Sequence, residues 1–184
     1  MDPERRENIL RILEESALAF HTAVDAVPEI SHQSSPSPDR WCVLQIVEHV
    51  ALAENGMFRM LNAAAPCEPM PGNAQREAAI FDRIASRRTR VESPDRAKPA
   101  GRFPDTRQAL DQFDAARQNT IRFARETDKD LFSVVVQHPF AGPVNGYEML
   151  LIMAAHPRRH VMQLAELASG RVTAHSAPDT ALPE

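Results

Sequence analysis

Four long stretches of this 184-residue chain carry apolar residues at every third or fourth position. This spacing places the apolar side chains on one face of an α-helix. It predicts amphipathic helices over about 3–27, 42–65, 105–126 and 145–170. Only the β-branched segment 133–137 predicts a short strand. Helices that each bury one face pack most simply around a common core, so we expect an all-α fold, a four-helix bundle of the up-and-down type.

Prolines interrupt the connection between the second and third predicted helices. This segment, 66–104, is long and irregular, and one short helix over about 74–90 fits inside it. Connections of this length often form lids or binding loops, so we expect it to shape a pocket. Four arginines cluster in it: Arg83, Arg87, Arg88 and Arg90. We interpret them as a solvated helix face, with an anion site as the alternative.

The bulk composition is that of an ordinary globular domain, with 43% hydrophobic and 25% charged residues. We predict a single helical bundle domain over 1–170 and a mobile C-terminal tail over 171–184. The net charge of −4 and the pI near 6.0 argue against a nucleic-acid partner. No apolar run reaches the roughly 18 residues of a membrane span, which argues against a membrane partner.

Two further features predict a cytoplasmic location. The N-terminal residues lead directly into an amphipathic helix and have no signal-peptide core. Cys42 and Cys67 lack the spacing of a metal or redox motif, and two cysteines do not make a disulfide framework.

Two histidines, His156 and His160, are four residues apart in the last predicted helix and fall on its apolar face. His49 lies on the apolar face of the second helix. A buried imidazole needs partners for its ring nitrogens, and a divalent metal can serve several imidazoles at once. Three histidine ligands would leave one coordination position open, as catalytic zinc sites do. The alternative is three unrelated core histidines, each satisfied by a backbone carbonyl or a water.

Three motifs of the chain resemble the DinB/YfiT-like superfamily. They are Trp41-Cys42 followed by Glu48-His49-Val50, the turn His138-Pro139-Phe140-Ala141-Gly142, and Ala155-His156-Pro157-Arg158-Arg159-His160-Val161-Met162-Gln163. The resemblance implies a four-helix bundle with a divalent metal held by His49, His156 and His160. It also implies a homodimer, and several relatives resemble transferases that use a low-molecular-weight thiol.

The chain departs from this pattern at two positions. Cys42 replaces the serine that usually follows the tryptophan, which weakens the helix cap but leaves the metal site intact. Pro157 lies between the two ligands of the last helix, where it removes one backbone hydrogen bond and predicts a local kink. The kink either aims His156 at the metal or is a tolerated bend. Pro157 also takes the place of the general-base glutamate of the H-E-x-x-H motif, so a peptidase mechanism has no support.

Three further residues could act around the centre. Gln45 and Gln163 lie about one turn from His49 and His160, where either could orient a ligand, although capping of the second helix is the simpler role for Gln45. His138 could approach the open side of the site or could simply form a turn. We expect Arg158 and Arg159 on the outer face, with contact to an anionic substrate as the alternative.

Three functions fit these residues. The first is a metal-dependent S-transferase that conjugates a low-molecular-weight thiol co-substrate to an electrophilic small molecule. The second is a metal-dependent hydrolase that uses a metal-bound hydroxide. The third is a metal-binding or stress-response module without turnover. The missing general base favours thiol chemistry, because a coordinated thiol needs no separate base. Three histidines suit zinc or nickel, with iron or cobalt as alternatives.

Overall fold

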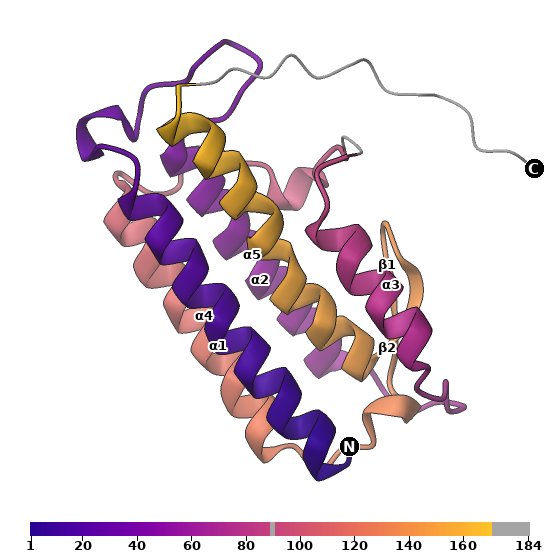
Figure 1. Ribbon diagram of the computed structural model, residues 1–184. Helices are drawn as coiled ribbons and strands as arrows, with labels where there is room; N and C mark the ends of the chain where they lie inside the picture. The colour runs from indigo at the N-terminus through magenta and orange to yellow at the C-terminus, as the bar shows by residue number, and fades with distance from the viewer. Residues whose placement is uncertain (89–90, 171–184) are drawn as a thin grey trace, which may run out of the picture.

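A computed structural model describes residues 1–88 and 91–170 of the chain. Four long helices form a bundle (Figure 1): α1 (Pro3–Asp25), α2 (Val43–Ala63), α4 (Thr106–Glu126) and α5 (Gly146–Ala168). The fifth helix, α3 (Ala74–Ala85), packs against α5. The all-α, four-helix prediction is thereby confirmed. The predicted C-terminal tail, 171–184, lies outside the described residues.

The remaining elements are short. A two-stranded antiparallel hairpin pairs β1 (Val135–His138) with β2 (Gly142–Asn145), one or two residues from the predicted strand. Single turns of 3₁₀ helix occur as η1 (Glu29–Ser31), η2 (Asp95–Ala97) and η3 (Leu131–Ser133). The α3 helix ends at Ala85 and not near residue 90, because Ser86 takes up an extended conformation. In its described residues the segment 66–104 is thus a long connection that contains α3 and the 3₁₀ turn η2, as the prolines indicate.

The order of the helices around the bundle differs from their order in the chain. Both α1 and α2 pack against α4 and α5, so the consecutive helices α1 and α2 lie diagonally opposite each other. At one end of the bundle the Arg6 guanidinium donates to the carbonyls of Ala124 and Arg125, which joins the start of α1 to the end of α4. At the same end, Lys129 Nζ donates to the Asn62 carbonyl near the end of α2.

The chain therefore runs up, down, down and up along the bundle. Helices α2 and α4 are parallel, and this path differs from strict alternation of neighbouring helices. Its physical reason is the connection from 64 to 105, which returns the chain to the end where α2 began. The length of this connection therefore accounts for the parallel arrangement of α2 and α4.

Side chains that the sequence pairs locally cap the helices. The Asp2 carboxylate accepts the Arg5 N–H at the start of α1. Asn145 and Glu148 form the predicted capping box of α5, with distances of 2.8 and 3.0 Å. Gly170 follows the end of α5 with a φ of 64°, the left-handed conformation that glycine adopts freely.

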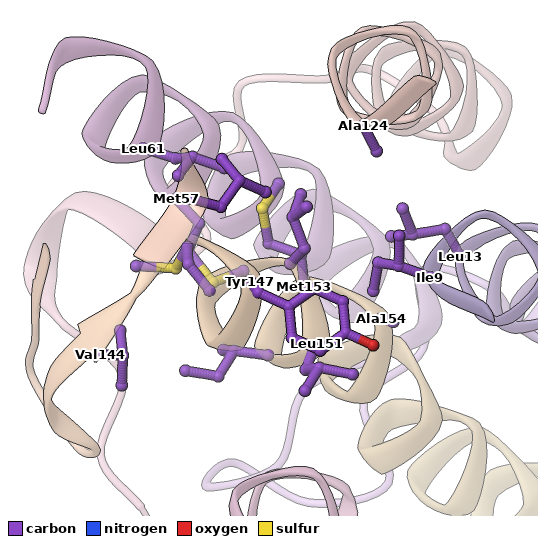
Figure 2. Packing of buried hydrophobic residues seen from close by; sticks show 14 of the residues in the cluster. Ile9, Leu13, Met57, Leu61, Ala124, Val144, Tyr147, Leu151, Met153 and Ala154 are labelled. Atoms are coloured by element: carbon purple, nitrogen blue, oxygen red, sulfur yellow. The ribbon is translucent and has the colours of Figure 1, made fainter. Parts of the chain in front are cut away.

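The bundle core is apolar but contains one ion pair at its centre. Figure 2 shows the apolar packing around Met153 and Leu61, to which α1 contributes Ile9 and Leu13. The buried Arg117 guanidinium binds the buried Glu54 carboxylate at 2.8 Å and donates to the Leu13 and Met153 carbonyls. One guanidinium therefore links all four long helices. Within the described residues, none of the helices has both the length and the apolar character of a membrane span.

Candidate metal centre

Helices α2 and α5 bring three histidines together. The Nε2 atoms of His49 and His160 lie 3.2 and 3.1 Å from the Nε2 atom of His156. His49 and His160 are buried, with 6% and 5% of their surface exposed, while His156 is partly buried and lines the adjacent cleft. One ligand atom from each of the three lies within 4.8 Å of the others. The structure thus assembles the residues that the sequence singled out.

The other ring nitrogens set the tautomers. His49 Nδ1 lies 2.8 Å from the Ala97 carbonyl oxygen, and His160 Nδ1 lies 3.0 Å from the Gln163 side-chain oxygen. A carbonyl oxygen only accepts, so both Nδ1 atoms carry the proton and both Nε2 atoms present a lone pair. His156 Nε2 can donate to only one of them. At least one close Nε2 pair therefore faces lone pair to lone pair, which a cation between the rings would relieve.

The electrostatics favour the neutral, metal-binding form of each ring. Burial lowers the pKa of His49, and it lowers the pKa values of His156 and His160 well below 6.5. The positive charge of Arg159 contributes to the lowering at all three. Neutral imidazoles with aligned lone pairs are the form in which histidine binds metals. These three residues could hold one divalent cation.

Helix α5 continues through Pro157 without a break. A proline at this position leaves the carbonyl four residues earlier, on Met153, without its helical N–H donor. The Arg117 guanidinium supplies the missing donor at 2.9 Å. The chain therefore remains α-helical past both histidines, and the lost hydrogen bond is replaced from α4. His156 Nδ1 remains buried with no hydrogen-bond partner among the described residues.

Glu48 holds the loop that forms one wall of the centre. Its buried carboxylate accepts the backbone N–H groups of Ala100, Gly101 and Arg102 at 2.9, 3.2 and 3.2 Å. Gly101 permits the turn through a φ of 70°. These bonds direct the Glu48 carboxylate to the loop rather than to the neighbouring His49 side chain. The carboxylate instead holds the loop whose Ala97 carbonyl orients His49.

The three residues predicted to act around the centre, Gln45, Gln163 and His138, differ in what they contact. Gln163 contacts His160, as expected. The Gln45 side chain accepts the Cys42 N–H at 3.0 Å. It therefore caps α2, which is the simpler of the two roles considered for it. His138 lines the cleft but belongs to its own turn, where Nδ1 accepts the N–H groups of Phe140 and Ala141. Burial, with the charges of Arg83 and Arg96, lowers the pKa of His138 to about 4.

A cleft of about 1970 Å³ opens beside the histidines. Its walls come from α2, α3, η2, α5 and the hairpin, and it includes Trp41, whose ring centre lies 4.9 Å from that of His49. The space is far larger than a metal ion and a water require. The expected role of the 66–104 segment agrees with this geometry, because α3 and η2 form one side of the cleft.

Two arginines depart from the expected outer position. Arg83, on α3, and Arg88, beyond its end, are exposed at the cleft, and Arg90 lies outside the described residues. The Arg87 side chain is only 14% exposed and contacts Glu166. Arg159 is half-buried, lines the cleft and donates to the Ser86 carbonyl. The helical pattern misplaced them because Arg87 follows the end of α3, and α3 itself covers this part of α5.

The sequence reasoning also missed Ala97 and Ser93, which approach His49 Nδ1. A backbone carbonyl has no residue signature, and Ser93 lies 44 residues from His49 along the chain. The available signal was Glu48, a carboxylate within an apolar helix beside a histidine. A buried carboxylate requires donors, and here the donors are backbone N–H groups of the loop.

A helical bundle with three convergent histidines on two of its helices defines the class: a four-helix-bundle protein with a potential metal centre. The model of the DinB superfamily matches residues 12–164, and the chain belongs to this superfamily. The structure is similar to that of YfiT from Bacillus subtilis, described as a probable metal-dependent hydrolase with an unusual four-helix bundle topology. The TM-score is 0.59 at 18% identity, over 92% of this chain and 89% of that chain. No curated protein matches this chain.

Proposed function

We propose that His49, His156 and His160 hold one divalent transition metal, and that the chain is a metal-dependent enzyme acting on small molecules. The convergence of three Nε2 atoms, two of them 3.2 and 3.1 Å from the third, carries this proposal. The donor set suits zinc or nickel, with iron or cobalt as alternatives. Three protein ligands leave a position open toward the cleft for a substrate.

The reaction we propose is the transfer of a low-molecular-weight thiol to an electrophilic small molecule. When bound, the metal supplies the charge that deprotonates a coordinated thiol. This choice is supported by the surroundings of the three histidines. Within the described residues, no carboxylate is hydrogen-bonded to any of them. The Glu48 carboxylate already accepts three backbone N–H groups. Hydrolysis usually uses a general base near the reacting water, whereas a coordinated thiol needs none.

The second candidate is a metal-dependent hydrolase. It is favoured by the fold, which is shared with YfiT, itself described as a probable metal-dependent hydrolase. A third candidate, a metal-binding module without turnover, would use the same histidines. Fold and metal do not determine the reaction, so the three must be separated by experiment.

The first experiment measures metal content by elemental analysis in the wild type, H49A and H156A. We expect about one equivalent of a transition metal in the wild type and loss of it in both variants. Titration with cobalt or nickel, followed by tryptophan fluorescence, gives a second readout. The chain has a single tryptophan, Trp41, and its ring lies against that of His49. A wild type that takes up no metal on reconstitution would mean that the histidines are structural.

The second experiment separates the reactions. Metal-loaded protein is incubated with an electrophile and a series of thiols, and separately with esters and amides. Thiol-dependent conjugation that disappears in H160A supports the transferase. Ester cleavage without thiol supports the hydrolase, and inactivity in both assays with metal bound supports the non-catalytic module.

We further propose that the protein acts in the cytoplasm as a homodimer. The free thiols of Cys42 and Cys67 are compatible with a reducing compartment. The dimer rests on the resemblance to the superfamily. Light scattering at micromolar concentration tests it, and the monomer mass of 20.5 kDa would contradict it.

A further inference from the structure

The cleft beside the histidines is strongly basic, although the chain as a whole has a net charge of −4. Eight arginines and one lysine line it, against three carboxylates. Nine of the chain's 21 basic residues therefore face one cavity. A cleft with one sign of charge concentrates ligands of the opposite sign.

Arg87 is the most unusual member of this group. Among the described residues its buried Nε atom has no hydrogen-bond partner, and its guanidinium makes a long contact of 3.4 Å to Glu166. The same Glu166 oxygen also binds Arg40, at 2.5 Å. One carboxylate thus serves two guanidiniums. Burial lowers the pKa of Arg87, since Glu166 does not fully offset the desolvation of its charge.

Arg159 extends this positive region to the centre itself. It follows His156 by three residues on α5 and precedes His160, and it lines the cleft with both. Its guanidinium reaches the carbonyl of Ser86, the residue before Arg87. Burial and the charge of Arg87 both lower the pKa of Arg159. Two half-buried guanidiniums are therefore close enough to repel each other at the edge of a site that would also hold a divalent cation.

Arg87 shares the Glu166 carboxylate with Arg40, so a further anion in the cleft would offset the cost of burying its charge. A guanidinium offers two parallel N–H groups that match the oxygens of a carboxylate or a phosphate. We infer that Arg87 and Arg159 bind the anionic group, a carboxylate or a phosphate, of the small molecule that reacts at the histidine centre. This inference rests on the proposed function and adds the substrate class to it.

The test is calorimetric titration with succinate, inorganic phosphate and the neutral analogue succinamide, on metal-free and zinc-loaded protein. We expect one of the two anions to bind and succinamide not to bind. R87Q and R159Q should each weaken the binding by about tenfold or more, as expected for loss of a charge-assisted contact. R125Q is the matched control, because Arg125 is an exposed arginine paired with Glu14 outside the cleft. It should stay within about twofold of the wild type.

Zinc content is measured in every variant, so that failure of the anion site and failure of the metal site are distinguished. Anion binding to metal-free protein that is lost in R87Q supports the inference whether or not zinc binds. Binding only to zinc-loaded protein, equal in wild type, R87Q and R159Q, would place the anion on the metal and overturn it. R87K keeps the charge but not the paired N–H groups, and an affinity between those of wild type and R87Q provides a second check if R87Q folds poorly.

Discussion

At the scale of single residues, the role of each histidine follows from the partner of its second nitrogen. His49 and His160 donate from Nδ1 to carbonyl oxygens, so their Nε2 atoms are free to bind a cation. His138 uses Nδ1 as an acceptor, so its proton is on Nε2. Histidines that line the same cleft therefore adopt different tautomers.

Replacement of Gln163 tests this orientation. In Q163L, His160 Nδ1 loses the acceptor that lies 3.0 Å away, and the ring is no longer held in one tautomer. We expect metal affinity to fall by about 10- to 100-fold with the fold unchanged. Competition with a chromogenic chelator measures the affinity. Q118L, at an exposed position of α4, serves as the control and should match the wild type.

The pH dependence of stability tests His138. Its folded pKa is about 4, below the ordinary 6.5, because burial disfavours the charged ring. As pH falls from about 6.5 to about 4, the unfolded chain takes up a proton that the folded chain does not. The stabilisation is therefore complete above about pH 6.5, falls by up to about 3 kcal/mol toward pH 4, and changes no further below that.

The measurement compares denaturant unfolding of metal-free wild type and H138N from pH 7.5 to pH 4. The asparagine oxygen can still accept the backbone N–H groups but does not titrate in this range. The stability difference between the two proteins should shrink as pH falls. A difference that is constant with pH would show that His138 does not carry the effect.

The convergence of the histidines could be predicted from the sequence, because two histidines four residues apart on an apolar helix face must project to the same side. The residues that surround these histidines could not be predicted in this way. The partner of His49 is the backbone carbonyl of Ala97, 48 residues away, and any residue type could provide it. The half-burial of Arg87 depends on how α3 is placed over α5, which helical periodicity does not encode.

At the scale of elements, α5 depends on another helix for its integrity. Pro157 leaves the Met153 carbonyl without a helical donor, and the Arg117 guanidinium of α4 replaces it. The same guanidinium pairs with the buried Glu54. A substitution on α4 therefore acts on the helix that carries two of the three histidines.

A double-mutant cycle between these positions makes the coupling measurable. R117M should destabilise the fold by about 3–5 kcal/mol, because it leaves the Glu54 carboxylate buried without its partner. In a P157A background the Met153 carbonyl regains its own N–H donor. The cost of R117M should then be smaller by about 1 kcal/mol, the value of one hydrogen bond. Chemical denaturation of the four proteins gives the cycle, and strict additivity would refute the replacement of the lost donor.

At the scale of the whole molecule, the centre joins helices that are far apart in the sequence. His49 and His156 are 107 residues apart, and each helix borders the other along the bundle. The bundle itself could be predicted, since periodicity shows that each helix has one apolar face. The diagonal placement of α1 and α2 could not, because an apolar face does not specify which helix covers it.

Metal binding should therefore stabilise the entire fold. An unfolded chain holds the histidines apart, so the ligand-saturated folded state gains about 2.7 kcal/mol at a free metal concentration 100 times Kd. For a chain of this size the expected rise in Tm is about 5–10 °C. Thermal unfolding with and without zinc measures it. H160A should show no rise, while R125Q should show the full rise, and an equal rise in H160A would indicate zinc binding elsewhere.

One turn of α2 carries both a proposed metal ligand and the residue that anchors the cleft wall. His49 holds the Ala97 carbonyl, and the adjacent Glu48 holds the backbone at 100–102. A molecule that shifts this wall on entering the cleft must also shift the ring of His49. Linkage then requires that the occupant change the affinity for metal by the same factor by which metal changes the affinity for the occupant. The metal supply of the cell would thus determine how many copies of the protein are loaded and also how tightly each copy holds its substrate.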